Sequence, residues 1–159
     1  LREQADYIID TSNLLVRDLR VELEKIFVQS KGYKNLFISV LSFGFKHGIP
    51  TDCDLVFDVR FLPNPYYEPE LKHKTGLDRE VQEFVLNADV TQVFLEKLID
   101  MVRFLIPNYI AEGKNQLVIG IGCTGGHHRS VTVAGELYAA LDVEDAQYGI
   151  KISHRDINR

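Results

Sequence analysis

Residues 122–130, GCTGGHHRS, combine the residue types that bind or attack phosphate. Glycine lets a backbone approach a ligand closely, arginine offers a planar fork that matches two phosphate oxygens, and hydroxyls and imidazoles donate further hydrogen bonds. The stretch follows an apolar run and precedes a helix-forming segment, so its N–H groups would converge at the positive end of a helix dipole. We therefore predict an anion-binding loop made of Cys123, Thr124, Gly125, Gly126, His127, His128, Arg129 and Ser130.

Two other interpretations fit the same stretch. The spacing Cys123-x5-Arg129, with Ser130 next, matches cysteine-dependent phosphatases, in which a thiolate at a helix N-terminus attacks phosphorus. Gly122 stands where those enzymes usually have histidine, and no separate loop resembles their general-acid aspartate loop. The stretch could instead be a tight strand-to-helix turn. A turn does not need so many donors, so we expect a domain that binds an anion without catalysing a reaction.

Asp58 and Arg60 are further candidates for the same site. They are two residues apart in the apolar run 54–61, so they point to one face of a strand. Asp58 could accept hydrogen bonds from a sugar hydroxyl or amino group, while Arg60 adds positive charge near the phosphate. The alternative is an internal ion pair that braces the loop, and the sequence leaves both interpretations open.

Basic and aromatic residues elsewhere form two weaker sets of candidates. Residues that could extend the pocket are Lys46, His47 and Tyr66. Residues that could contact RNA or a protein partner are Lys72, Lys74, Lys151, Arg155 and Arg159.

Composition limits the class of protein. The 159 residues carry a net charge of −5, which argues against a uniformly basic nucleic-acid binder, and 45% of them are hydrophobic, which suits one domain with its own core. Cys53 and Cys123 form no CxxC pair, so we expect free thiols, no metal site and no cofactor in this domain. No apolar run is long enough to span a membrane, and no signal peptide pattern is present; we expect a cytoplasmic protein.

Hydrophobic periodicity predicts strands that alternate with helices. The expected fold is a three-layer α/β domain with a mostly parallel sheet, in which ligands bind beyond the carboxyl ends of the strands. Thr11 or Ser12 would cap a first amphipathic helix that ends near Gly32, and Asp78, Asp89 and Gly113 would bound later helices. The predicted strands are 35–43, 54–61, 116–122 and 147–156, and the later helices are 77–86, 89–113 and 130–143. The long proline-rich loop between residues 61 and 77 is of a kind that is more often functional than idle.

Four motifs in order carry a resemblance to a known family. They are SFGFKHGIP (42–50), DLVFDVRFLPNP (54–65), TGLD (75–78) and IGIGCTGGHHRSV (119–131). With them the chain closely resembles the C-terminal domain of the RapZ family of P-loop nucleotide-binding proteins, also described as RNase adapters, over about residues 30–159. Residues 1–30 resemble a linker and amphipathic helix that follow an N-terminal P-loop domain absent from this chain, and 31–159 a sensing and adaptor domain. The Walker A pattern GxxxxGK[ST] does not occur here.

The resemblance implies a function in regulation. Full-length relatives bind small regulatory RNAs, present them to a ribonuclease and control synthesis of glucosamine-6-phosphate, which the C-terminal domain senses. They are also expected to bind and slowly hydrolyse ATP or GTP through the missing domain. By the family's motifs, the sugar phosphate would contact Asp58, Thr124, Gly125, His128 and Arg129. A phosphorylated aminosugar, a small RNA, a ribonuclease and further copies of the chain are therefore the expected partners. A mainly oligomerising role, through apolar helix faces, is a third hypothesis.

Overall fold

The computed structural model describes residues 11, 16, 19 and 36–159. Internal contacts divide the chain into two units, Leu1–Tyr33 and Lys34–Arg159, and the second unit contains every element described below. The first predicted helix, near residues 11–27, falls almost entirely outside the described residues, so it remains a prediction.

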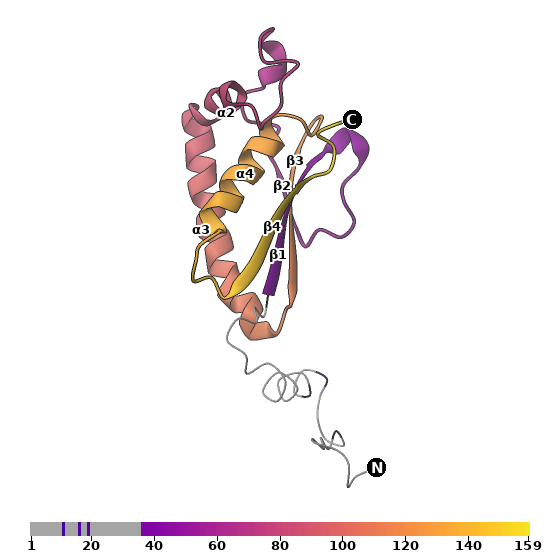
Figure 1. Ribbon diagram of the computed structural model, residues 1–159, viewed down its shortest axis with the longest axis vertical. Helices are drawn as coiled ribbons and strands as arrows, with labels where there is room; N and C mark the ends of the chain where they lie inside the picture. The colour runs from indigo at the N-terminus through magenta and orange to yellow at the C-terminus, as the bar shows by residue number, and fades with distance from the viewer. Residues whose placement is uncertain (1–10, 12–15, 17–18, 20–35) are drawn as a thin grey trace. The chain divides into compact units, whose positions relative to one another are not determined.

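The second unit combines a parallel sheet with α-helices (Figure 1). The strands are β1 (Leu36–Gly44), β2 (Leu55–Asp58), β3 (Gln116–Cys123) and β4 (Tyr148–His154). The helices are α2 (Arg79–Leu86), α3 (Asp89–Glu112) and α4 (Arg129–Leu141), with short 3-10 helices η2 (Phe45–His47) and η3 (Pro65–Tyr67). The predicted α/β class and parallel sheet are confirmed.

Most of the predicted boundaries differ by one or two residues from the observed ones. Strand β2 is the exception, because the chain turns after Asp58, whose carboxylate accepts the backbone N–H of Arg60 at 2.9 Å. Asp78 occupies the N-cap of α2 as predicted, although its side chain accepts from Thr75 instead of from the helix. The prediction for Asp89 was wrong, since Ala88 occupies the N-cap of α3. Gly113 ends α3 in the left-handed conformation, as predicted.

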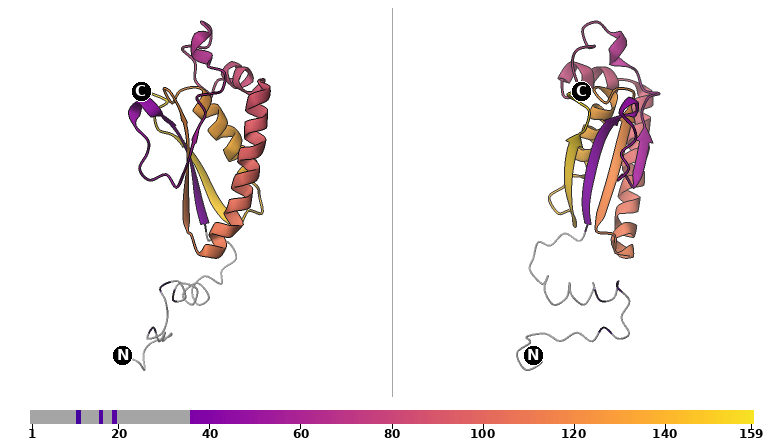
Figure 2. Two further views of the ribbon diagram at one scale, coloured as in Figure 1. Left: turned by 180° about the vertical axis from the view of Figure 1, so that it is seen from behind. Right: turned by 90° about the vertical axis from the view of Figure 1, so that its right-hand side faces the viewer.

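The strand order is β2-β3-β1-β4, and α2, α3 and α4 lie on one face of this sheet (Figures 1 and 2). The described residues therefore form two layers where the prediction had three, and the remaining predicted helix lies outside them. The core lies between the two layers and contains Ile38, Val40, Ile119 and Leu137, all fully buried. Of the helices in the described residues, none combines the length and apolar character needed to cross a membrane.

Aromatic rings cover part of the opposite face of the sheet. Phe43, which is fully buried, and Phe45 pack edge to face with centroids 4.9 Å apart. They lie over Gly122, where an added Cβ would come within 2.5 Å of both rings. A glycine on β3 is therefore required for the packing that holds η2 close to the end of that strand.

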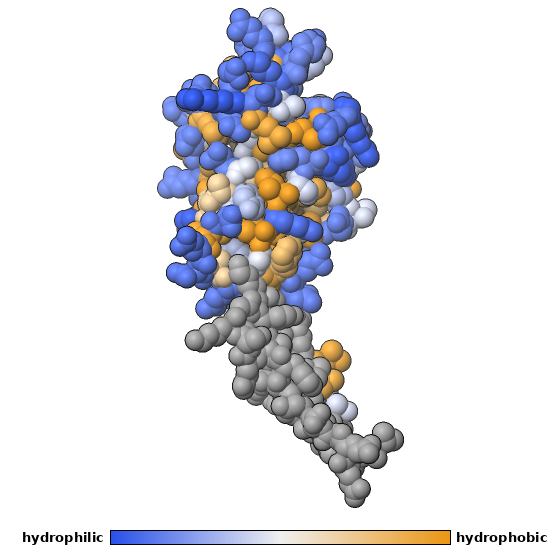
Figure 3. Space-filling model, viewed as in Figure 1, coloured by the Kyte–Doolittle hydropathy of each residue, from blue (hydrophilic) through white to orange (hydrophobic). Residues whose placement is uncertain are grey.

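Because all four strands are parallel, their carboxyl ends meet at one edge of the sheet. Gly44 pairs with Cys123, Asp58 with Gly122, and Ser42 with His154, so the loops that follow the strands start side by side. The longest of them, between β2 and α2, stands at the top of Figure 1 and is largely hydrophilic in Figure 3.

Gly122→Ala should destabilise the domain by about 1–3 kcal/mol, because the added Cβ would lie 2.5 Å from the fully buried Phe43 ring and would force this ring to shift. Gly135→Ala is the matched control: Gly135 lies inside α4, and its added Cβ would meet nothing within 4 Å. That change should stabilise the domain by about 0.5–1 kcal/mol through helix propensity. Urea unfolding of both variants measures the difference. Equal effects would contradict the packing argument.

Candidate functional site

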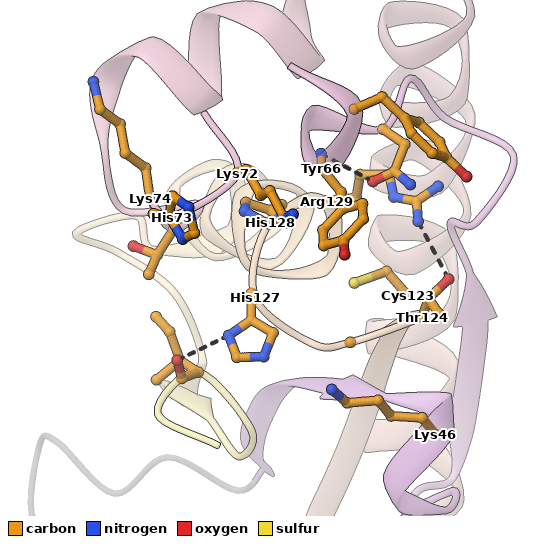
Figure 4. Close-up of a pocket in the computed structure, with 15 residues that line it drawn as sticks. Lys46, Tyr66, Lys72, His73, Lys74, Cys123, Thr124, His127, His128 and Arg129 are labelled. Atoms are coloured by element: carbon orange, nitrogen blue, oxygen red, sulfur yellow. Dashed lines mark hydrogen bonds between the residues drawn. The ribbon is translucent and has the colours of Figure 1, made fainter. Parts of the chain in front are cut away.

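A cavity of about 570 Å³ opens at the carboxyl edge of the sheet (Figure 4). Segments that follow all four strands contribute to it. The residues that line it are Lys46 after β1; Asn64, Tyr66, Tyr67, Lys72, His73, Lys74 and Thr75 after β2; Cys123, Thr124, Gly125, His127, His128 and Arg129 at the end of β3 and beyond; and Ile157 after β4. Most of the predicted anion-binding loop thus lines one cavity, together with Lys46 and Tyr66.

The loop between β3 and α4 folds around the thiol of Cys123. The sulfur accepts the backbone N–H of Gly126 at 3.2 Å and lies 3.1 Å from the hydroxyl oxygen of Ser130. Gly126 has φ of +83°, a conformation that disfavours other residues, and an added Cβ there would lie 2.7 Å from the Gly44 nitrogen. Gly126 and Ser130 therefore shape the loop, although neither lines the cavity.

Arg129 joins two loops from inside the protein. The side chain is only 5% exposed, and its guanidinium donates to the carbonyl oxygens of Arg60 and Leu62 and to the hydroxyl of Thr124 at 3.3 Å (Figure 4). Its buried Nε has no hydrogen-bond partner among the described residues. A buried cation held only by neutral oxygens is costly unless an anion approaches it.

His128 is the second buried donor at the cavity. It is 9% exposed, and its Nε2 has no partner among the described residues. Burial lowers the pKa of His128, and the positive charge of His127 acts in the same direction, while the carbonyl groups of Lys74, Leu71 and Lys72 oppose both. His128 is therefore neutral near pH 7 and carries a single N–H, which can be donated to a ligand when the proton is on Nε2 and to the loop carbonyls when it is on Nδ1.

Lys46 approaches the glycine loop from the end of β1. Its backbone N–H donates to the Thr124 carbonyl at 3.2 Å, and its Nζ lies 3.9 Å from the position of a Cβ built on Gly125. The side chain is exposed and can turn toward an anion in the loop. His47 follows it in η2 but does not line the cavity.

Asp58 and Arg60 lie outside the cavity lining and form the internal ion pair that the sequence left as one alternative. Arg60 Nη2 donates to the carboxylate of Asp58 at 2.6 Å, and the guanidinium lies 4.3 Å from the centre of the Phe45 ring. The hydrogen bonds from Arg60 lower the pKa of Asp58, and the more distant charge of Arg129 adds to this. Asp58 thus remains ionised close to Arg129.

The five candidates for RNA or partner contact are placed differently from one another. Lys72 and Lys74 line the cavity. Lys151 does not line the cavity; its Nζ lies over the Phe37 ring. Arg155 and Arg159 pair with the fully buried carboxylate of Asp156, at 2.8 and 3.5 Å. The ion pairs hold these two arginines against the protein and reduce their availability to a partner.

Several lining residues were not predicted. Asn64, Tyr67, His73 and Thr75 belong to the long loop that the sequence marked as functional, but they were not named among the candidate site residues. Ile157 enters through the C-terminal turn, where its carbonyl oxygen lies 3.1 Å from Nδ1 of His127. Among the described residues, no three His, Cys, Asp or Glu side chains gather as a metal-binding cluster.

The fold and the cavity define a parallel α/β domain with a glycine-rich loop at a helix N-terminus and a cavity lined by basic side chains. Residues 36–158 match the family model described as the RapZ C-terminal domain, and the chain belongs to this family. It is 64% identical over 159 residues to proteins called nucleotide-binding protein from Agathobacter rectalis and Lachnoclostridium phytofermentans, and 57% identical to one from Ruminiclostridium cellulolyticum. The whole chain is covered, but only 54%, 55% and 54% of those proteins, so it spans about half their length.

The lowered pKa of His128 predicts a stability change in weak acid. As pH falls below about 6.5, the unfolded chain takes up a proton on this histidine more readily than the folded domain does, so the free energy of unfolding decreases. His128→Gln should make this decrease smaller between about pH 6.5 and 5. Urea unfolding across that range measures it, with His73→Gln, an exposed imidazole, as the control. An unchanged pH profile in His128→Gln would contradict the assignment.

Proposed function

We propose that this domain binds a phosphorylated sugar, of the aminosugar phosphate class, with the phosphate against residues 123–129. The unpartnered nitrogens of His128 and Arg129 are the observation that carries the proposal. Both side chains are at least nine-tenths buried and line the same cavity, at the N-terminus of a 13-residue helix. Buried polar atoms without partners are uncommon, and a phosphate oxygen is a suitable acceptor for the Arg129 Nε–H and for His128 when its proton is on Nε2.

The charge of the cavity supports an anionic ligand. Its lining includes Lys46, Lys72, Lys74 and Arg129, and no carboxylate is present among the described lining residues. The chain as a whole has a net charge of −5, so this concentration of positive charge is a local feature. A site of this kind attracts anions and repels cations.

Polar groups beside the glycine loop can bind the sugar. The hydroxyl of Thr124 and the side chains of Asn64, Tyr66 and Thr75 line the cavity and can hydrogen-bond to sugar hydroxyls. We propose Asp58, outside the lining, as the acidic acceptor for an amino group on the sugar, where that group would compete with Arg60. Recognition of the amino group thus depends on opening this exposed ion pair.

Occupancy of the cavity would regulate a partner, and we propose an RNA or a protein in an adaptor role. Because the cavity walls come from segments after all four strands, a ligand would link the β2–α2 loop with the C-terminal turn, both of which lie at the surface. The relatives are called nucleotide-binding protein, and their chains are about twice as long. ATP or GTP binding and slow hydrolysis are therefore proposed for the full-length protein and not for this domain.

Lys46→Met should weaken the binding of glucosamine-6-phosphate about tenfold, because one charge-assisted contact to the phosphate is lost. The side chain is exposed, so the melting temperature without ligand should not change. Isothermal titration calorimetry with glucosamine-6-phosphate, glucose-6-phosphate and glucosamine measures the effect. Arg129→Ala is less informative, since it would also strip the Arg60 and Leu62 carbonyls of their donor.

Lys97→Met, on the exposed surface of α3, is the matched control and should bind as the wild type does. Asp58→Asn should remove any preference for glucosamine-6-phosphate over glucose-6-phosphate while leaving glucose-6-phosphate affinity unchanged. If neither sugar phosphate binds the wild type, or if Lys46→Met binds them equally well, the proposed phosphate site is wrong.

The arrangement around Cys123 favours a second candidate, a cysteine-dependent phosphatase. The Gly126 N–H donates to the sulfur and the Ser130 hydroxyl lies 3.1 Å from it, an arrangement that can stabilise a thiolate nucleophile. Against catalysis, no carboxylate among the described lining residues could protonate a leaving group, and backbone carbonyls hold the Arg129 guanidinium.

We expect no hydrolysis of 4-nitrophenyl phosphate above the buffer rate when the chain is kept reduced, because this site is arranged to hold phosphate without an acid for the leaving group. A continuous absorbance assay at 405 nm checks this (roughly the nitrophenolate maximum). Turnover that disappears in Cys123→Ser would establish the phosphatase instead.

A further inference from the structure

The cavity has a second basic wall, on the loop between β2 and α2 that packs against the glycine loop. Lys72, His73 and Lys74 belong to the loop between β2 and α2 and line the cavity. In Figure 4, His73 and Lys74 lie at the left, whereas Thr124 and Arg129 lie at the right. The wall is fixed to the glycine loop, since the backbone N–H of Gly76 donates to the His127 carbonyl at 2.8 Å.

Of the two lysines in this wall, Lys72 keeps its charge available for a ligand. Lys74 Nζ donates to Glu80 at 2.8 Å, an ion pair that also raises the Lys74 pKa. Lys72 forms no ion pair with a carboxylate in the described part of the chain; its Nζ lies 4.8 Å from the centre of the Tyr66 ring. A cation–π contact at an exposed site is weak and leaves the ammonium free to bind an anion.

One phosphate does not account for both walls. Lys46, the unpartnered Arg129 Nε and His128 can already meet a phosphate monoester, whose charge does not exceed two. Lys72 adds a positive charge beyond these, and this charge repels Lys46 and Arg129 unless further negative charge enters the cavity. The second wall therefore fits a second anionic group on the same ligand.

Aromatic rings stand beside Lys72. Tyr66 and Tyr67 line the cavity, pack edge to face with centroids 5.9 Å apart, and are 52% and 79% exposed. Exposed tyrosine rings next to cations are surfaces on which nucleobases stack. A cavity of about 570 Å³ also lies within the range that holds ligands larger than a monosaccharide phosphate.

We propose that the ligand carries a nucleoside diphosphate group, free or attached to the sugar, with one phosphoryl group at residues 123–129 and the other at Lys72, and with the base on Tyr66. The inference rests on the proposed phosphate site and names the class of ligand that enters it. A nucleoside diphosphate differs from a nucleoside monophosphate only in the second phosphoryl group, so a matched pair of probes isolates the second wall.

The experiment is calorimetric titration of the 159-residue chain with inorganic phosphate, pyrophosphate, UMP and UDP. UDP should bind at least about tenfold more tightly than UMP, a gain expected for one added charge-assisted contact. Lys72→Met should lower UDP affinity to that of UMP and change UMP affinity less than about twofold, while Lys72→Arg should retain the preference. Tyr66→Ala should lower the affinity for UDP but not for pyrophosphate, which has no base to stack on the ring.

Lys46→Met and Lys97→Met complete the set of variants. Lys46→Met should lower the affinities for UMP and UDP by the same factor, because Lys46 lines the cavity at the glycine loop. Lys97→Met should change neither affinity. Equal affinity of the wild type for UMP and UDP would contradict the proposal that a second phosphoryl group binds at Lys72, but it would not contradict the proposed phosphate site at residues 123–129. Binding of none of the four probes would overturn the phosphate site as well. A uridine oligonucleotide without terminal phosphates is the last probe. If it binds as tightly as UDP, the ligand is RNA and the proposal of a nucleoside diphosphate is wrong.

Discussion

The parallel direction of the four strands is the constraint on which the site depends. It brings four carboxyl ends to one edge, so that segments separated by more than a hundred residues, such as Lys46 and Ile157, line one cavity. The strands themselves contribute the Cys123 thiol at most; the loops supply nearly all the donors. A rigid sheet with variable loops is an arrangement in which ligand preference can change without altering the fold.

One buried carboxylate holds these loops together. Asp156 accepts the backbone N–H of Gly44 at 2.8 Å, pairs with Arg155, and has its Cβ 2.9 Å from the position of a Cβ built on Gly126. Although burial would raise the pKa of Asp156, hydrogen bonds from Arg155 and Gly44 lower it overall. The ionised carboxylate therefore fixes the C-terminal turn against the start of η2 and against the glycine loop.

Local sequence patterns predicted the elements well, because buried strands and helix faces have their own periodicities. The glycine loop could also be predicted, since its residue types and its place before α4 are local features. Contacts between residues far apart in the sequence could not be predicted. Nothing in the sequence indicates that Arg129 binds carbonyls nearly seventy residues away, that Asp156 is buried, or that Lys72 lines the cavity at the carboxyl edge while Asp58 lies outside its lining. These depend on the path of loops that have no periodicity.

Arg129 connects stability with binding. Its hydrogen bonds to the Arg60 and Leu62 carbonyls and the Thr124 hydroxyl satisfy most donors, but neutral oxygens do not neutralise a buried cation. The ionised carboxylate of Asp58, whose pKa is lowered by hydrogen bonds from Arg60 and by the charge of Arg129, is already paired with Arg60. Among the described residues Arg129 forms no ion pair, and an anionic ligand would supply the missing charge. The domain is then most stable when occupied, and because Arg129 spans the β2–α2 loop and the glycine loop, the same charge that binds the ligand also fixes the two loops that enclose it.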